Sequence, residues 1–225
     1  MNGLLPQHGF SARLLVGIIS VFLWSLSPFE VAESHSRVPI KILVVYHSRT
    51  GHTEQMAHAV MKGAQSVKGS HVTIRRVGEV SAKELFATDA LIVGSPVYWS
   101  NMSGEVKTFF DNWQFRFGVF PEFKMRNKVG AAFATGGQVS SGKELTMLTI
   151  LAAMLGNQMI VVGGGGAFGA SATTEGTSPG IDQDELDQAR KLGKRVAEVT
   201  QLVKRGQMGI SNPSPSEKFQ DRLEQ

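Results

Sequence analysis

The feature that most constrains this chain is the alternation of short apolar runs and amphipathic segments between residues 39 and 203. The apolar runs are rich in β-branched residues, which favour strands, and the segments between them repeat apolar residues at helical spacing. We predict five strands, at Ile40–Tyr46, Val72–Val77, Ala90–Val93, Val129–Ala134 and Met159–Val162. The predicted helices are His52–Val67, Met102–Trp113, Glu144–Leu155 and Asp182–Val203.

Apolar strands joined by helices predict a parallel sheet that right-handed crossovers bury on both faces. Five strands fit a flavodoxin-like, doubly wound α/β sheet with helices on both faces. We assign this domain to residues 38–205 and expect the polar segment 206–225, with Pro213 and Pro215, to be a disordered tail. Because ligands of such sheets bind at the carboxyl ends of the strands, the loops at those ends are the candidate site.

The N-terminal segment differs from the rest of the chain. Residues 14–29, LLVGIISVFLWSLSPF, follow Arg13 and resemble a secretory signal. The apolar core, residues 14–26, is shorter than the roughly 20 residues that span a bilayer. We therefore interpret residues 1–37 as a signal peptide or membrane-anchoring segment. The expected location is the periplasm or a membrane surface reached through residues 14–29, and the alternative is a cytoplasmic protein with an uncleaved extension.

Two properties of the composition exclude whole classes of function. The chain has no cysteine, which excludes disulfides, thiolate catalysis, Cys-ligated zinc and protein-held iron–sulfur clusters. The formal net charge is +4, and residues 39–203 hold 17 Lys and Arg against 14 Asp and Glu. This small excess is spread out and accompanies no nucleic-acid-binding motif, so we expect no nucleic-acid partner. No metal site is expected either, because His47 and His52 alone do not make one.

The loop after the first predicted strand has the properties of a phosphate-binding loop. It leads directly into a helix, whose first backbone N–H groups attract anions. Hydroxyl side chains add donors, and a glycine lets the backbone approach a ligand closely. The predicted phosphate contacts are Ser48, Arg49, Thr50, Gly51, His52 and Thr53. The alternative interpretation is a helix cap rich in hydroxyls, and the absence of a Walker sequence disfavours nucleoside triphosphates.

Two further loops follow the third and fourth predicted strands. The first has two adjacent aromatic residues and a proline, which suit a flat heterocycle that needs an apolar wall. Its candidate residues are Pro96, Val97, Tyr98, Trp99, Asn101 and Met102. The second loop offers backbone N–H groups that can stabilise a reduced, anionic ring. Its candidate residues are Thr135, Gly136, Gly137 and Gln138. The alternative for the first loop is a pair of surface aromatics beside a tight turn.

Two local patterns near these loops also yield predictions. Ser141 and Glu144 have the spacing of a capping box, so we expect them to begin the next helix. Gly164, Gly166 and Gly169 match the dinucleotide pattern G-x-G-x-x-G. That pattern must open a helix directly, whereas a loop over residues 171–179 follows here. We therefore interpret these glycines as a flexible connection rather than a nucleotide site.

The segments His47–Thr53, Gly94–Gly104 (GSPVYWSNMSG) and Lys128–Gly163 resemble the flavodoxin-like WrbA type of NAD(P)H:quinone oxidoreductase. The resemblance covers about residues 39–203. It implies FMN, with its phosphate on Ser48–Thr53 and its isoalloxazine ring against Pro96–Met102 and Thr135–Val139. It also implies NADH or NADPH as the electron donor and a small-molecule quinone as the acceptor.

The chain departs from this family in two places. The segment after the fifth predicted strand, Gly163–Gly169, is shorter than is usual, so a homo-dimer becomes as reasonable an expectation as the family's homo-tetramer. A family histidine near the end of the preceding helix is replaced around Gly156 and Asn157, so no role is carried over to that position.

Three hypotheses about function follow. In the first, the protein is an enzyme that passes two electrons from NAD(P)H to a quinone-type acceptor through FMN, with no side chain needed as acid or base. In the second, it is a flavodoxin-type electron carrier without its own small-molecule substrate. Such carriers are strongly acidic, and a pI of about 9.4 argues against that reading. In the third, the protein binds no flavin and acts through an interface.

Overall fold

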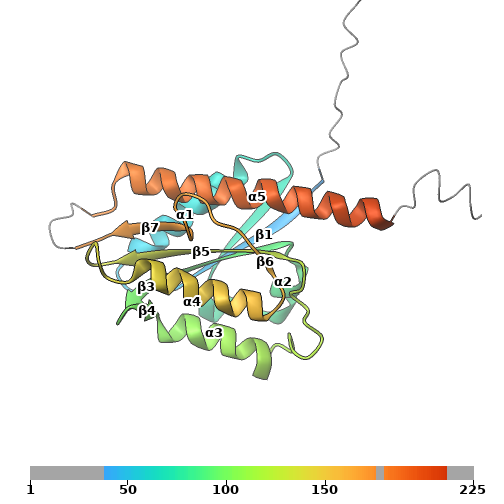
Figure 1. Cartoon of the computed structure of the whole chain (residues 1–225), viewed down its shortest axis with the longest axis horizontal. Helices are drawn as coiled ribbons and strands as arrows, with labels where there is room; N and C mark the ends of the chain where they lie inside the picture. The colour runs from blue at the N-terminus through green and yellow to red at the C-terminus, as the bar shows by residue number, and fades with distance from the viewer. Residues whose placement is uncertain (1–37, 176–179, 212–225) are drawn as a thin grey trace, which may run out of the picture. The chain divides into compact units, whose positions relative to one another are not determined.

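The computed structural model describes residues 38–175 and 180–211 (Figure 1). Neighbouring strands pair in parallel in the order β2-β1-β3-β5-β6, which confirms the predicted doubly wound α/β sheet. These strands are β2 (Ser70–Arg76), β1 (Ile40–Tyr46), β3 (Ala90–Tyr98), β5 (Val129–Gly136) and β6 (Ile160–Val161). Two further strands were not predicted: β4 (Asn101–Met102), antiparallel to β3, and β7 (Ala170–Thr173), parallel to β5.

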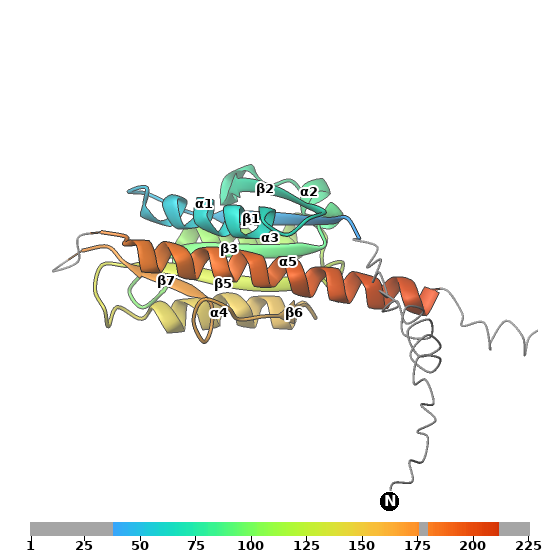
Figure 2. The ribbon, with the colours of Figure 1, turned by 90° about the horizontal axis from the view of Figure 1, so that it is seen from above.

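Helices cover both faces of the sheet (Figures 1 and 2). One face carries α1 (His52–Gln65) and α5 (Gln183–Ser211). The other carries α2 (Ala82–Ala87), α3 (Gly104–Phe115) and α4 (Lys143–Gly156). Alternate residues of β1 enter the two cores, with Ile42 and Val44 on one side and Leu43 and Val45 on the other. Burial on both faces explains why this strand is apolar throughout.

Helices α1 and α5 approach each other closely through glycine. A Cβ on Gly63 would lie 1.9 Å from the Arg190 carbonyl oxygen, and one on Gly193 would lie 1.9 Å from the Val60 carbonyl oxygen. No side chain fits at either position without moving the two helices apart. The two glycines thus allow the short distance between α1 and α5.

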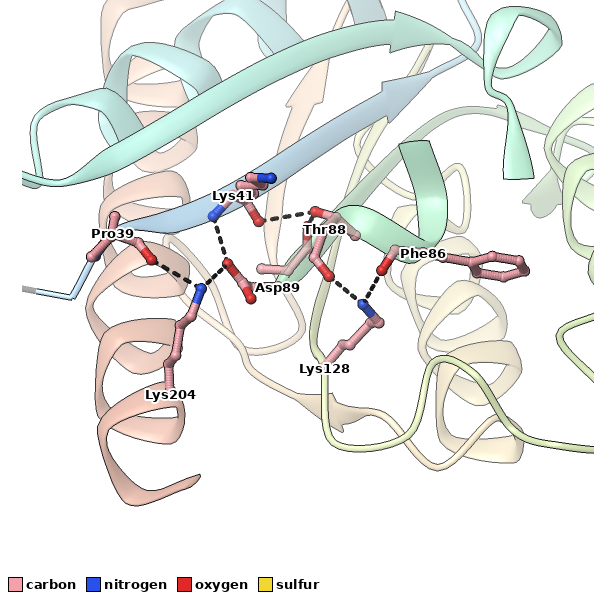
Figure 3. Close-up of polar contacts among 8 residues, drawn as sticks. Pro39, Lys41, Phe86, Thr88, Asp89, Lys128 and Lys204 are labelled. Atoms are coloured by element: carbon pink, nitrogen blue, oxygen red, sulfur yellow. Dashed lines mark hydrogen bonds and ion pairs between the residues drawn. The ribbon is translucent and has the colours of Figure 1, made fainter. Parts of the chain in front are cut away.

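A polar cluster closes the amino edge of the sheet (Figure 3). The Lys204 ammonium of α5 donates to the Pro39 carbonyl (2.9 Å) and to the Asp89 carboxylate (2.8 Å). Asp89 also accepts from the Lys41 backbone N–H at 2.7 Å. At the start of β5, the Lys128 ammonium donates to carbonyls at the end of α2, those of Phe86 (2.8 Å) and Thr88. Burial lowers the pKa of Lys128.

The fifth position of the sheet is occupied by two short strands instead of one. Strand β6 pairs with the start of β5, at Val129 and Gly130, and β7 pairs with its end, from Phe133 to Gly136. The glycine-rich segment Gly163–Gly169 joins these two strands. It leads into a strand and not into a helix, as expected when we rejected it as a dinucleotide-binding motif. A Cβ on Gly165 would meet the Gln188 carbonyl of α5 at 2.3 Å, which shows close packing against that helix.

Several predicted boundaries were wrong. Helix α5 continues to Ser211 instead of ending at Val203, so residues 206–211 are helical and not a disordered tail. Strand β3 runs to Tyr98, five residues beyond its predicted end, because Ser95 and Pro96 continue the pairing with β5. Residues 171–173, expected in a loop, belong to strand β7 (Ala170–Thr173). The short helix α2 was not predicted, although Ser81 and Glu84 form a capping box at its start.

The remaining predictions on chain organisation lie outside the described residues. These are the signal or anchor segment 1–37 and the tail from residue 212 to residue 225. Within residues 38–175 and 180–211, no helix is long and apolar enough to cross a membrane.

Candidate functional site

Helix α1 begins with an anion-binding geometry. The N-cap residue of α1, Gly51, has a left-handed backbone conformation (φ 92°). No described side chain accepts a hydrogen bond from the first-turn N–H groups of this helix. By contrast, Ser81, Ser103 and Asp182 accept backbone N–H bonds at the starts of α2, α3 and α5. Apart from its two neighbours in the chain, no described residue places an atom within 4 Å of where a Cβ on Gly51 would stand. The first-turn N–H groups of α1 therefore remain available to an anion that approaches over Gly51.

All three hydroxyls of the same loop have partners within the protein, and the exposed Thr50 hydroxyl lies 3.0 Å from the His52 Nδ1. The Ser48 hydroxyl accepts from the Gly51 N–H at 3.1 Å and closes the loop on itself. The Thr53 and Thr135 hydroxyls lie 2.7 Å apart, and both residues are buried. This bond ties the first turn of α1 to the end of β5, 82 residues further along the chain. Thr53 and Thr135 thus join the two loops, and their hydroxyls are directed at each other.

A network of charged and aromatic side chains holds the predicted phosphate loop, residues 48–53, in place. The Arg76 guanidinium donates to the Ser48 carbonyl (3.0 Å) and to the Glu54 carboxylate (2.7 Å), and it lies 5.3 Å from the centre of the Tyr46 ring. The Tyr46 hydroxyl donates to Glu54 at 2.5 Å. Burial, assisted by this bond, raises the pKa of Tyr46 to about 12. The same bond, with Arg76 nearby, lowers the pKa of Glu54, so its carboxylate stays charged.

The aromatic loop after β3 is a tight hairpin in a strained conformation. Val97 pairs with Met102 and Tyr98 with Asn101, which leaves Trp99 and Ser100 as the two turn residues. Both have a positive φ, 52° and 60°, as a type I′ turn requires but as Trp and Ser rarely adopt. Trp99 is fully exposed. A large aromatic side chain held in a strained turn and left unpacked points to a ligand.

The loop after β5 differs from the prediction. Helix α4 begins at Lys143 behind Gly142, which is left-handed (φ 89°), and no described side chain caps it. The predicted Ser141–Glu144 capping box was therefore wrong, because Gly142 takes the cap position. A Cβ there would lie 2.7 Å from the Ser100 Cβ, so the hairpin and this loop are in contact. The Ser141 hydroxyl is buried without a described partner.

Lys143 lies beneath this loop and is 5% exposed. Its ammonium donates to the Gln138 carbonyl at 3.2 Å and to the Thr173 hydroxyl at 2.6 Å. No carboxylate of the described chain forms an ion pair with it, although it stands at a helix N-terminus, where a cation is disfavoured. The carboxyl edge of the sheet therefore carries a buried positive charge.

A cavity of about 840 Å³ opens beside the hairpin and the end of β1. This volume lies within the range of small-molecule sites. His47 and Tyr98 form part of its wall, and their rings meet edge to face with centroids 6.4 Å apart. Glu105 lies 3.5 Å from the His47 imidazole, and its pKa is lowered, first by its own backbone N–H and also by the Ser103 hydroxyl. The wall also includes Val77, Phe109 and Asn112.

The structure brings the three predicted loops together at the carboxyl edge. Pro96 pairs with Thr135 in the sheet, and the Thr149 hydroxyl of α4 donates to the Asn101 side chain at 3.0 Å. Arg49, Thr50 and Gln138 are exposed around this edge. Four residues of this region were not predicted from the sequence: Tyr46, Glu54, Arg76 and Lys143. For Arg76, its place at the carboxyl end of an edge strand was a usable signal. Nothing in the local sequence indicated that Lys143 would be buried.

These loops suit a phosphate joined to a flat ring, and they define a flavodoxin-fold protein of the FMN-binding type. The sequence profile of the NADPH-dependent FMN reductase family matches residues 40–174, so the chain belongs to that family. The predicted resemblance to WrbA-type flavoproteins is thereby confirmed, and the protein is an oxidoreductase.

Two sequence relatives illustrate the range of the family. An NAD(P)H dehydrogenase (quinone) of Acidithiobacillus ferrooxidans is 32% identical, with a match over 72% of this chain and 98% of the relative. A protein named flavodoxin from Clostridium saccharobutylicum is also 32% identical, over 70% of this chain and 96% of the relative. The crystal structure of a WrbA-like flavodoxin from Agrobacterium tumefaciens is 26% identical with a TM-score of 0.61, covering 72% and 98% of the two chains.

The predicted cofactors, FMN with NAD(P)H as donor, agree with this family. The residues present also fit FMN on structural grounds. The uncapped start of α1 and the open space over Gly51 suit a phosphate, and the buried Ser141 hydroxyl without a partner suits a polar group of the ring. Within the described residues, no group of three His, Asp or Glu side chains is placed to hold a metal ion.

Proposed function

We propose that this flavin oxidoreductase transfers two electrons from NADH or NADPH to a quinone. The observation that carries the proposal is the uncapped first turn of α1, placed in one site with the aromatic hairpin and the loop after β5. The family match and the quinone-reducing relatives support the same reaction class. When bound, FMN supplies the chemistry, since its ring accepts and donates electron pairs.

The chain's own residues bind and orient the flavin. The backbone N–H groups after Gly51 and the Thr50 hydroxyl hold the phosphate, and Arg76 with Glu54 keeps that loop in place. Tyr98 and Trp99 would provide the wall for the ring. Gln138 and its neighbours, in the loop after β5, would contact the ring from that loop.

Lys143 favours the reduced state of the site. A buried cation next to the loop after β5 lowers the free energy of any nearby negative charge, and reduction of the ring produces such a charge. The ammonium is bonded to a carbonyl and a hydroxyl, and no carboxylate of the described residues forms an ion pair with it.

The cavity beside Tyr98 is the proposed substrate site. Val77, Tyr98 and Phe109 offer an apolar wall for a flat ring, while His47 and Asn112 offer hydrogen bonds to quinone oxygens. This combination fits a small quinone better than a protein redox partner.

An electron carrier is the second candidate, favoured by the relative named flavodoxin. A carrier must present a docking surface of suitable charge. The excess of basic residues in this chain is opposite to the acidic surface of typical carriers.

An anaerobic titration of the FMN-loaded full chain separates these functions. We expect the flavin absorbance to bleach with NADPH or NADH and to return when a benzoquinone is added. Bleaching with dithionite alone would move the assignment to a carrier. Failure of the chain to bind FMN would overturn both. As the matched variant, Asn112→Ala should raise the KM for quinone without changing FMN binding.

We also propose that residues 1–37 direct export to the periplasm or tether the protein to a membrane. The support is the signal-like composition of residues 14–29. Fractionation of expressing cells tests the proposal. Recovery of the full-length chain in the cytoplasmic fraction would favour the alternative of an uncleaved extension.

A further inference from the structure

Basic residues gather at the amino edge of the sheet, part of which Figure 3 shows. The segments that end the helices or begin the strands at this edge are residues 38–42, 66–71, 87–90, 125–129, 156–160 and 200–209. They hold six Lys or Arg and a single acidic residue, Asp89. The six cations are Lys41, Lys68, Arg126, Lys128, Lys204 and Arg205. These residues are far apart in the sequence, and the parallel strands bring them to one side of the domain.

The cations extend across the width of the sheet. Lys68 precedes β2 and Arg126 precedes β5, and these strands are three positions apart in the sheet. Because neighbouring strands are spaced by about 4.8 Å, the starts of β2 and β5 lie about 14 Å apart. Both side chains are exposed, and neither forms an ion pair with a described carboxylate. A row of this length fits an extended anionic surface better than a single small anion.

Two ammonium groups between these ends retain donors for a further acceptor. An ammonium has three N–H donors. Lys128 and Lys204 each bond to two described acceptors, which leaves one donor of each available. Both residues line a cavity of about 180 Å³ together with Arg126 and Asn127. A phosphate group at this cavity would accept charge-assisted hydrogen bonds from cations on two neighbouring elements.

Helix α5 adds apolar side chains to the same edge. From Lys204, which bonds to the carbonyl of Pro39, the helix continues to Ser211 over about 10 Å and projects past the start of β1 (Figure 1). Leu202 is 58% exposed and Met208 is 45% exposed. Exposed apolar side chains among cations are typical of protein segments that bind the surface of an anionic membrane. The backbone of a nucleic acid offers such side chains no apolar partner.

The course of the chain points to the same partner. Residue 38 begins the described domain at the amino edge, next to the contact between Pro39 and Lys204. The apolar segment 14–29 ends nine residues before it. Nine residues reach at most about 30 Å when fully extended. An anchor in residues 14–29, as proposed above, would therefore hold the amino edge within that distance of a bilayer.

We propose that the amino edge is a docking surface for an anionic phospholipid membrane. Its cations bind lipid phosphates, and Leu202 and Met208 enter the interfacial layer. The described residues carry this proposal without an anchor in residues 1–37, and it goes beyond the proposed redox reaction.

Docking through this edge also orients the domain. The flavin site lies at the opposite ends of the strands, and a seven-residue strand such as β1 is about 23 Å long. This consequence rests on the proposed function: NAD(P)H and the quinone then reach the site from the water and not from the lipid.

Co-sedimentation of the full chain with vesicles tests the docking. Phosphatidylcholine vesicles that contain about one-quarter phosphatidylglycerol should bind the chain. Raising the salt concentration from about 0.1 M to about 0.5 M should weaken this binding, because salt screens the lipid charge. Vesicles of phosphatidylcholine alone measure the contribution of residues 14–29. Equal binding to the two kinds of vesicle would leave that segment as the contact and overturn the proposal.

A matched pair of double variants locates the contact. Lys68→Glu with Arg126→Glu removes two cations from the edge, and each cation near an anionic surface strengthens binding about fivefold, so the partition coefficient should fall by about 30-fold or more. Lys83→Glu with Lys191→Glu has the same net charge at exposed positions away from the edge and should bind as the wild type does. Circular dichroism verifies that both variants fold. Equal losses in the two variants would indicate attraction by net charge alone and exclude this surface.

Single cysteines measure the orientation, because the chain has no cysteine of its own. Met208→Cys and Asp184→Cys are at exposed positions of α5 that lie about 36 Å apart along the helix. With an environment-sensitive dye on each, spin-labelled lipid should quench position 208 and leave position 184 unchanged. Equal quenching of both positions, quenching of position 184 alone, or quenching of neither would contradict the proposed orientation. The measurement needs no flavin, so its failure is distinct from a failure of the proposed reaction.

Discussion

The two edges of the sheet differ in how many of their polar groups are hydrogen-bonded within the protein. At the amino edge, the ammonium groups of Lys128 and Lys204 are each bonded to two protein acceptors, and Asp89 is bonded to both Lys41 and Lys204. At the carboxyl edge, α1 and α4 begin without side-chain caps, and the buried Ser141 hydroxyl lacks a described partner. The lysine at this end of β5, Lys143, forms no ion pair with a carboxylate of the described residues.

This difference separates what holds the fold from what holds a ligand. Polar groups that bond only to the protein contribute to stability, and their loss should be measurable without flavin. Polar groups left open at the other edge contribute little to the stability of the free chain, and their effect should appear when FMN is present. Substitutions of protein-bonded groups, among them Glu54 at the carboxyl edge, and substitutions of the open groups should therefore change different quantities, and the following predictions test that separation.

The largest effect is expected from a negative charge at the start of α1. Thr50→Asp places a carboxylate where the flavin phosphate is expected, and it should weaken FMN binding by about 100-fold or more through charge repulsion. The same carboxylate interacts favourably with the helix dipole, so the free chain should be as stable as the wild type or slightly more so. Fluorescence titration with FMN and urea unfolding measure the two quantities. Thr50→Asn, similar in shape but neutral, is the control, and equal losses in both variants would exclude the charge effect.

At the amino edge, Lys128→Met should reduce the free energy of unfolding by about 1–3 kcal/mol, because the Phe86 and Thr88 carbonyls lose their donor. FMN affinity should not change. Urea unfolding of the free chain provides the measurement, with Lys83→Met, at an exposed position of α2, as the control. A loss of FMN affinity without a loss of stability would break the proposed division between the two edges.

A smaller effect of opposite sign is expected in the aromatic hairpin. Trp99→Asn should raise the stability of the free chain by about 0.5–1 kcal/mol, because asparagine tolerates a positive φ and the exposed indole makes no packing contribution. FMN binding should weaken at the same time. Trp99→Phe keeps the strain and should leave the stability unchanged. If Trp99→Asn destabilises the free chain, the strain is not stored in this turn.

The smallest effect concerns the pH dependence of stability. The pKa of Glu54 is lowered in the folded state, so its contribution is present above the ordinary value of 4.5 and is lost as the pH falls through the folded pKa. Glu54→Gln should therefore unfold with a shallower dependence on pH below about 4.5. Thermal unfolding between pH 3 and pH 7 measures the slope, and identical slopes in the two proteins would remove Glu54 from the network. Glu198→Gln on α5 is a suitable control.

The sequence predicted those parts of the fold that depend on local pattern. The apolar run of β1, the glycine and hydroxyl loop behind it and the amphipathic α1 all have periodicities that neighbouring residues determine. Strand β7 has no such pattern, because Ala170–Thr173 is made of small residues and becomes a strand only by pairing with β5. Its position depends on contacts with residues more than 35 positions away.

The site shows the same limit. The loops were predicted from residue types, but the hairpin was not, since Trp99 and Ser100 are poor candidates for a turn that favours Asn and Gly. The spacing of Ser141 and Glu144 indicated a capping box. In the structure Gly142 is the N-cap residue instead, and it lies against Ser100 of the hairpin. The burial of Lys143 depends equally on β7, which supplies the Thr173 hydroxyl.

The division of the last sheet position between β6 and β7 also protects the molecule from aggregation. A long, regular edge strand can pair with the edge of another molecule, and such pairing propagates into fibrils. Here one edge is interrupted by the glycine segment, so β6 and β7 present two and four residues instead of one continuous strand. The opposite edge, β2, carries the charged side chains of Arg75 and Arg76, and charged residues on an edge strand disfavour pairing with another molecule.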